Sequence, residues 1–140
     1  MDINADITAT STLTIQNFAS VDLTSDVDLS SGGALSVNSN VTVINLSGGG
    51  AHSLSTTAAS DGGITLTNLT DSGAENLTVS AAGDLTLNGS TLNGGGTHSF
   101  TADSDDDNND TLTVSAALTL GSATFSGSGS GDAITRPKAR

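Results

Sequence analysis

The feature that most constrains the fold is a passage of sequence that occurs twice. The stretch LNGGGTHSF (Leu92–Phe100) is a near copy of LSGGGAHSL (Leu46–Leu54), 46 residues further along the chain. Three other stretches also resemble one another, namely ALSVNSNVTV (Ala34–Val43), NLTVSAAGDLTL (Asn76–Leu87) and TLTVSAALTL (Thr111–Leu120). Repeats of roughly 20–50 residues built from short strands are typical of solenoids, so this period fits two coils of about 23 residues each.

Alternation of aliphatic and small polar residues predicts the strands. Segments such as TLTI (Thr12–Ile15) and ITLT (Ile64–Thr67) place aliphatic side chains on one face and Thr on the other, which is the two-residue period of a half-buried strand. No segment has the period of a helix, and Gly, Asn, Asp and Ser fill the intervals, as turns require. The alternation predicts these inward residues: Leu13, Ile15, Leu35, Val37, Val41, Val43, Ile64, Leu66, Leu77, Val79, Leu85, Leu87, Leu112, Val114, Leu118 and Leu120.

We therefore expect an all-β chain that forms a three-sided parallel β-helix (β-solenoid) over residues 1–126. Each coil would lie ~4.8 Å above the previous one, with Leu, Val and Ile stacked inside. So narrow an interior agrees with the absence of Trp and Tyr and the presence of only three Phe. The alternative is a β-sandwich, which usually carries a core Trp and a corner Tyr. Residues 127–140, a Gly/Ser-rich segment with a basic tail, are expected to be flexible.

The charge distribution argues against several functions. The chain has 15 Asp and Glu against three Lys and Arg, and all three cations, Arg136, Lys138 and Arg140, lie in the last five residues. A body without Lys or Arg repels phosphate groups, so we expect neither nucleic-acid binding nor binding to anionic membranes. No apolar run approaches the ~20 residues of a membrane span, so membrane insertion is not expected. The first residues, MDINADITAT, lack the apolar region of a signal peptide.

The clearest candidate for chemistry is the acidic run DSDDDNND (Asp103–Asp110). The candidate metal ligands are Asp103, Asp105, Asp107, Asn109 and Asp110. The first three alternate like the first, third and fifth ligands of a calcium loop, and the Asn could offer the backbone carbonyl of the seventh position. The match then ends, because position six is Asn108 rather than Gly and position twelve is Val114 rather than Glu. The alternative is a solvated surface loop without a metal.

Two histidines, His52 and His98, occupy equivalent positions of the repeat. Two coils would separate them by ~9–10 Å along the axis. This separation is too large for both to bind one zinc ion directly, which requires ~2 Å from each. We expect both side chains to be solvated or to lie at corners.

The composition does not favour an enzyme. Residues 1–135 contain no Lys or Arg to bind the carboxylates of acidic sugars, and only three Phe to stack on sugar rings. Nothing distinguishes one pair of carboxylates as the acid and base of a glycosidase. The chain has no cysteine, which excludes a thiolate nucleophile and disulfides.

Three phrases resemble a known family: GDLTLNGS (Gly83–Ser90), NLTVSA (Asn76–Ala81) and GGGTHSFTA (Gly94–Ala102). They are similar to the filamentous-haemagglutinin-like, β-strand-repeat adhesins, which are very large secreted bacterial proteins built from right-handed parallel β-helices. The resemblance covers roughly residues 34–126. The family's amino-terminal secretion domain carries an Asn-Pro-Asn motif, whereas the only proline here is Pro137. The resemblance therefore implies a shaft rather than an export signal.

These observations predict a non-enzymatic structural role. We expect a shaft segment or filament subunit of a secreted, acidic bacterial surface protein, located outside the cell or on its surface. The alternative is a calcium-dependent adhesive or matrix-binding module, with Ca²⁺ as its cofactor. The expected partners are further repeats or second copies joined head to tail, and a receptor or glycan on a host or cell surface.

Overall fold

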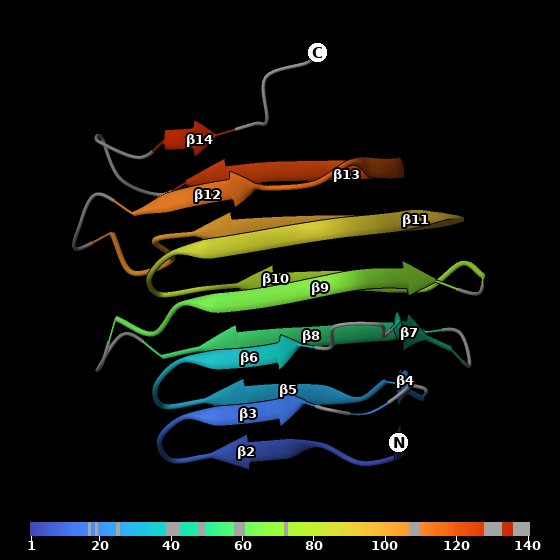
Figure 1. The fold of residues 1–140 in the computed structure, drawn as a ribbon, viewed down its shortest axis with the longest axis horizontal. Helices are drawn as coiled ribbons and strands as arrows, with labels where there is room; N and C mark the ends of the chain where they lie inside the picture. Colours follow the sequence, from blue (N-terminus) through green and yellow to red (C-terminus); the bar gives the residue numbers. More distant parts are fainter. Residues whose placement is uncertain are drawn as a thin grey trace.

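The chain folds into stacked coils of short strands (Figure 1). The structure is a computed structural model that describes residues 1–16, 18, 20–24, 26–38, 43–47, 50–57, 61–71, 73–106, 110–127 and 133–135, with the backbone alone at 38, 43 and 133–135. Within these ranges there is no helix, and hence none of the length and apolar character needed to cross a membrane.

The strands form three faces around a common interior. Face A consists of β1 (Asp2–Ile3), β4 (Ser20–Leu23), β7 (Val43–Leu46), residues 69–71 of β9 (Ile64–Asp71), residues 90–92 of β11 (Leu85–Ala102) and residues 118–120 of β13 (Leu118–Gly127). Face B consists of β2 (Ile7–Ala9), β5 (Asp28–Ser31), β8 (Ala51–Thr56), β10 (Asn76–Ser80), residues 97–102 of β11 and residues 122–127 of β13. Face C consists of β3 (Leu13–Gln16), β6 (Leu35–Asn38), residues 64–67 of β9, residues 85–88 of β11, β12 (Thr111–Val114) and β14 (Ala133–Thr135).

Each strand pairs in parallel with the equivalent strand of the next coil. The register along face A runs through Asp2, Asp22, Asn45, Thr70, Thr91 and Thr119. Successive coils therefore take 20, 23, 25, 21 and 28 residues. The repeat of 46 residues spans two coils, because His52 pairs with Leu77 and Leu77 pairs with His98. The parallel β-solenoid is thus confirmed, and the antiparallel β-sandwich is excluded.

The inward side chains of the three faces form one hydrophobic core. The predicted inward residues that are buried are Ile15, Leu35, Val37, Ile64, Leu66, Leu77, Val79, Leu85, Leu87, Leu112 and Val114. Leu13, Leu118 and Leu120 belong to the first and last coils and are half-buried, because a coil covers them on one side only. Val41 lies outside the described residues, as does the side chain of Val43. Burial of each such side chain stabilises the fold by about 1.5–3 kcal/mol.

Asp, Asn and Gly mark the corners between faces. Asp26, Asp61 and Asn68 have left-handed backbone conformations, with φ between 49° and 55°, which Asn and Asp tolerate better than most residues. The repeated glycines have a different cause. A side chain on Gly94 or Gly96 would collide with the backbone of residues 73–75 in the coil below. Gly94 and Gly96 are therefore required where this corner lies directly on the corner below it.

Carboxylate and amide side chains at the corners also cap the next coil. Four such side chains among the described residues accept a hydrogen bond, at or near the start of a strand, from a backbone N–H one coil later: Asp6 from Asp28 (3.0 Å), Asp26 from Ala51 (2.9 Å), Asn76 from Thr97 (2.8 Å) and Asp84 from Thr111 (2.8 Å). Each pair satisfies a donor at or near the start of a strand, where the ladder has not yet begun. Part of the acidic composition thus has a structural cause.

Parallel pairing extends beyond the expected boundary at residue 126. β13 reaches Gly127, and β14 pairs with β12 through Ala133–Thr135. The three-residue β14 is too short to show an alternation that could be recognised in the sequence. The solenoid therefore includes part of the segment that was expected to be a flexible tail.

We predict that Leu66→Ala lowers the free energy of unfolding by about 2–5 kcal/mol, because Leu66 is fully buried between Val37 and Leu87 and truncation leaves a cavity. Thr65→Ala, on the exposed side of the same strand, should change it by less than about 0.5 kcal/mol. Urea unfolding of both variants measures the difference. Equal losses in the two variants would contradict the inward and outward assignment.

Candidate functional site

The acidic run begins at the corner between faces B and C, where backbone hydrogen bonds join successive coils. The Asp103 N–H donates to the Gly83 carbonyl (3.4 Å), and the Gly83 N–H donates to the Gly62 carbonyl (3.2 Å). A Cβ on Gly83 would lie 2.5 Å from the carbonyl oxygen of Asp61. Aspartates that are far apart in the sequence, Asp61, Asp84 and Asp103, are thereby brought to one edge of the solenoid.

The predicted calcium ligands differ in their surroundings. Asp103 is fully buried, and Asp105 and Asp110 are half-buried. Asp107 and Asn109 lie outside the described residues. Among the residues that are described, no three His, Cys, Asp or Glu side chains are placed to hold one metal ion. The calcium site therefore stays a prediction.

Asp110 is the residue of this corner whose pKa is clearly shifted. Burial, together with the carboxylates of Asp61, Asp84 and Asp103 and a hydrogen bond with Asp61, raises the pKa of Asp110 to about 6, and burial is the largest of these causes. We refer to these four residues, Asp61, Asp84, Asp103 and Asp110, as the acidic corner. Sequence reasoning missed Asp61 and Asp84, although both precede the first aliphatic residue of a face C strand, at Ile64 and Leu85.

The two histidines lie inside the solenoid. The expectation that they are solvated or at corners is wrong, because His52 and His98 are 1% and 0% exposed. They occupy an inward column of face B in which His52, Leu77, His98 and Ala123 follow one another. Each His stands two residues before an inward apolar residue, Leu54 or Phe100, so the two-residue period of a strand was the signal that could have placed it inside.

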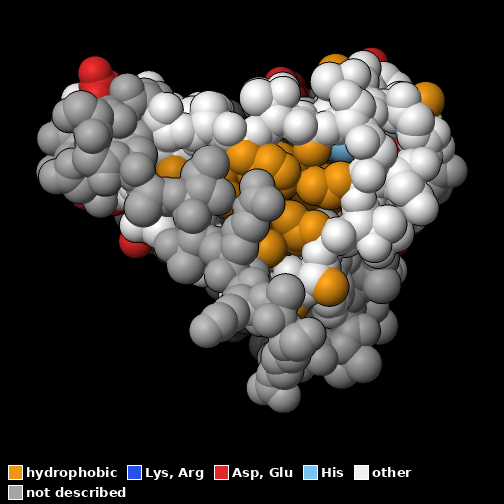
Figure 2. Space-filling view, turned by 90° about the horizontal axis from the view of Figure 1, so that it is seen from above, with side chains coloured by type: hydrophobic (Ala, Val, Ile, Leu, Met, Phe, Trp, Pro, Cys, Tyr) orange, Lys and Arg blue, Asp and Glu red, His pale blue; other side chains and the backbone are white. Residues whose placement is uncertain are grey.

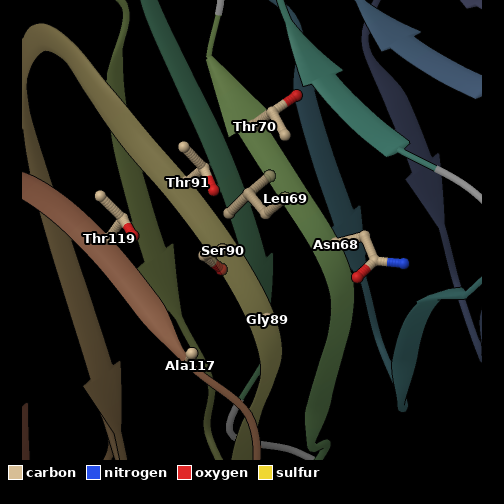
Figure 3. A pocket seen from close by; sticks show the side chains of 8 residues that line it. All are labelled: Asn68, Leu69, Thr70, Gly89, Ser90, Thr91, Ala117 and Thr119. Carbon is tan, nitrogen blue, oxygen red and sulfur yellow. The ribbon is translucent and has the colours of Figure 1, made fainter.

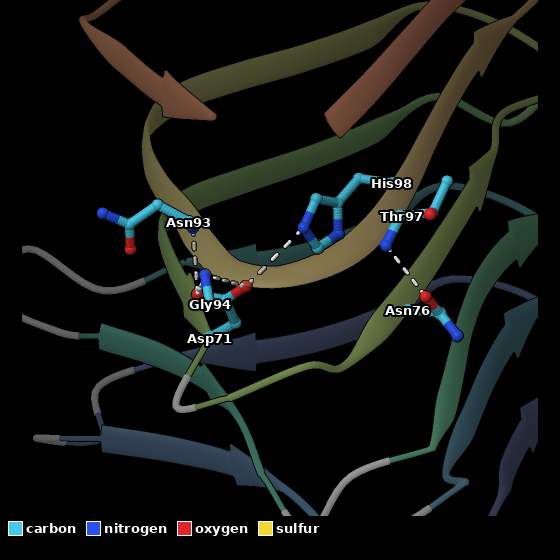
Figure 4. A network of polar contacts seen from close by, with 6 residues as sticks. All are labelled: Asp71, Asn76, Asn93, Gly94, Thr97 and His98. Atoms are coloured by element: carbon cyan, nitrogen blue, oxygen red, sulfur yellow. Dashed lines mark hydrogen bonds and ion pairs between the residues drawn. The ribbon is translucent and has the colours of Figure 1, made fainter. Parts of the chain in front are cut away.

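A buried polar cluster surrounds His98 (Figure 4). Its Nε2 atom lies 3.6 Å from a carboxylate oxygen of Asp71, and both side chains are fully buried. Asp71 also accepts hydrogen bonds from the backbone N–H groups of Asn93 and Gly94, at 3.1–3.2 Å. Burial lowers the pKa of His98 below 6.5, against the opposing effect of the Asp71 and Glu75 carboxylates. The cluster is suited to holding the corner between faces A and B rather than to exchanging protons with a substrate.

The outer surface of face B consists largely of hydroxyl groups. One column contains Thr8, Ser30, Ser55, Ser80, Thr101 and Ser126, and a second contains Ser53, Thr78, Ser99 and Thr124. Within the first column, Ser30 donates to Thr8 (3.2 Å) and the hydroxyls of Thr101 and Ser126 are 2.9 Å apart. Such cross-strand pairs of Ser and Thr link neighbouring coils.

A shallow pocket lies on face A beside its corner with face C (Figure 3). Its lining residues are Asn68, Leu69, Thr70, Gly89, Ser90, Thr91, Ala117 and Thr119. Ser90 is buried at a position that Leu69 and Leu118 occupy in the neighbouring coils, and its hydroxyl makes no hydrogen bond within the described chain. None of the eight residues has a titratable side chain that could act as general acid or base. The pocket therefore lacks the group that would activate a Ser or Thr hydroxyl.

No protein-family model, curated protein or solved structure matches the chain. The features that bear on function are consequently the continuous coils, the acidic corner and the two ends of the solenoid.

We predict that Asp110→Asn raises the melting temperature at pH 7, because it removes a carboxylate whose ionised form the fold disfavours. The folded state holds a proton on Asp110 up to about pH 6, whereas the unfolded chain releases it near 3.8, so stability should increase as the pH falls through this window. The advantage of Asp110→Asn should therefore shrink between pH 7 and pH 4. Thermal unfolding of both proteins across this range tests the prediction.

The matched control is Asp28→Asn, which removes one negative charge from an exposed site on β5. If Asp110→Asn and Asp28→Asn raise the melting temperature equally at every pH, the effect comes from the net charge and the acidic corner has no special role.

Proposed function

We propose that the chain is a structural shaft segment or filament subunit of a secreted, acidic bacterial surface protein, without enzymatic activity. The observation that supports this best is the continuity of the three faces. One inward column of face B is apolar from the first coil to the last and consists of Ile7, Leu29, Leu54, Val79, Phe100 and Phe125. A rod built from such coils lengthens by ~4.8 Å with each coil, because each added coil repeats the same strand pairing and the same inward packing.

The surface chemistry is consistent with an exposed rod. Residues 1–135 carry 15 carboxylates and no Lys or Arg, so their outer surface repels similar rods and stays hydrated. The outer columns of face B consist of short hydroxyl side chains, many of which are half-buried. A surface of this kind offers few apolar groups for non-specific association.

The resemblance to filamentous-haemagglutinin-like adhesins adds the location. The phrases that carry it lie in β10 and β11 and in the turn between them, in the middle of the stack. As a part of such a protein, the chain would stand outside the cell and hold a receptor- or glycan-binding region away from the surface.

Immunogold labelling of intact source cells tests the proposal. An antibody raised against purified residues 1–140 should label the surface of intact cells or fibres released from them, and brief protease treatment of the cells should remove the label. Labelling that appears only after lysis would contradict a surface role.

The acidic corner favours calcium as a second candidate, in which the chain is a calcium-dependent adhesive or matrix-binding module. Carboxylates from three coils raise the pKa of Asp110 there, and a divalent cation near Asp110 would relieve the repulsion of its ionised form. The bound ion would join coils that are otherwise held by backbone hydrogen bonds and the core. In this role calcium would stiffen the rod rather than take part in a reaction.

We predict that, if the acidic corner binds calcium, millimolar Ca²⁺ raises the melting temperature at matched ionic strength. Free calcium at ten times Kd should stabilise the fold by about 1.4 kcal/mol. The double variant Asp103→Asn with Asp110→Asn should lose this response, whereas Asp2→Asn with Asp28→Asn, which removes two exposed charges elsewhere, should keep it. An unchanged melting temperature of the wild-type chain in Ca²⁺ would leave only the structural role of these aspartates.

A further inference from the structure

The C-terminal end of the solenoid exposes part of its core. Leu118, Leu120, Ala123 and Phe125 in β13 are only half-buried, although they pack against the core. Phe125 stacks on Phe100 of the coil below, with ring centroids 5.1 Å apart and planes at 15°. Viewed from this end, apolar side chains occupy the middle of a three-cornered outline (Figure 2). One side of this layer is covered by β11, and on the other side the apolar side chains of β13 are only half-buried.

The N-terminal end has a matching set of side chains. Ile7 and Leu13 are half-buried and pack against the core from the opposite end. Ile7 begins the inward column that Phe125 ends. On face A, Ile3 is the first residue of an inward column that continues with Leu23 and Leu46. Leu92 and Leu120 hold the same position on face A in later coils. Because the columns run straight through the molecule, the first coil fits on the last without a change of register.

The backbone edges at the two ends are also complementary. Within the described chain, β1, β2 and β3 pair only with β4, β5 and β6, and β13 pairs only with β11. Each of these strands therefore has one edge of N–H and C=O groups without a neighbouring strand. Such edges accept another parallel strand, and solenoids normally need caps to prevent this.

Charge favours the same contact. β13 has no charged residue, so it presents no carboxylate to the Asp2 and Asp6 of a first coil. All three cations of the chain follow β14 within five residues in the sequence. The only Lys and Arg residues of the chain thus follow the C-terminal end of the described solenoid in the sequence, whereas the first coil carries Asp2 and Asp6.

We propose that the C-terminal end of one copy, formed by β13 and β14, binds the N-terminal end of a second copy, formed by β1, β2 and β3, in parallel and in register. The contact joins unlike surfaces and does not close on itself, so it produces an open filament with a direction. This inference rests on the proposed structural role and specifies its partner as a second copy of this chain.

Engineered cysteines test this contact directly, because the natural chain has none. Thr8 and Ser126 are the first and last residues of one outward column, five coil steps apart. Within one molecule they are about 24 Å apart, which prevents a disulfide. In a stack, Ser126 of one copy lies about 4.8 Å from Thr8 of the next, which is a distance that a disulfide spans. The double variant Thr8→Cys with Ser126→Cys should therefore form a ladder of covalent multimers on oxidation.

The control is Ser30→Cys with Ser126→Cys, in which the first cysteine stands in the same column but one coil inside the end. This variant should give no ladder. Light scattering of the unmodified full chain should show particles that grow with concentration, and Ile7→Glu should keep them monomeric, whereas Thr8→Glu on the outer surface should not. Circular dichroism and a melting curve identify which variants are folded.

A folded, monomeric wild-type chain at high concentration without a ladder from Thr8→Cys with Ser126→Cys would overturn the stacking proposal. Equal ladders from the control would overturn it as well, because the contact would then not join the ends. Neither result bears on the surface labelling of source cells. If stacking fails and the label is found, the proposed role as a shaft segment within one longer chain still holds.

Discussion

The parallel backbone hydrogen bonds between successive coils are the interaction on which the rest of the structure depends. They fix the register, and the register aligns inward side chains into columns such as Leu13, Leu35, Ile64, Leu85 and Leu112. The columns then determine which residues fit: aliphatics inside, hydroxyls outside, and Asp, Asn or Gly at corners, where the backbone is left-handed or coils touch. Even the carboxylates take part, since several of them cap a strand of the next coil.

The two-residue alternation was sufficient to predict the strands and most of the core, because Leu66 and Leu87 differ from their Thr neighbours in exactly the property that burial selects. It was insufficient for the polar interior. Asp71 stands where Leu46 stands one coil earlier, and it is stabilised there by the N–H groups of Asn93 and Gly94 in the following coil. Such partners are remote in sequence, so no local pattern reveals them. The acidic corner has the same origin, because coil stacking brings Asp61 and Asp84 to the acidic run.

The same geometry underlies the proposed structural role, the calcium candidate and the proposed stacking of copies. A rod of stacked coils needs no catalytic group, and its length is set by how many coils are joined, within one chain or between copies. Carboxylates such as Asp6 and Asp26 accept a hydrogen bond from a strand of the next coil, whereas the ionised form of Asp110 is disfavoured by the carboxylates around it. Under the proposals made here, a divalent cation would act at that one edge, and a second copy would bind at the apolar ends.

Distances between spin labels along one outward column test the parallel register most directly. Thr8→Cys is combined in turn with cysteines at Ser80, Thr101 and Ser126, and each labelled protein is diluted into unlabelled chain so that only distances within one molecule contribute. These positions are three, four and five coils away, so the distances should increase in equal steps of about 4.8 Å, although the coils differ in length. Distances that follow the number of intervening residues, or that fail to increase from one pair to the next, would contradict the solenoid.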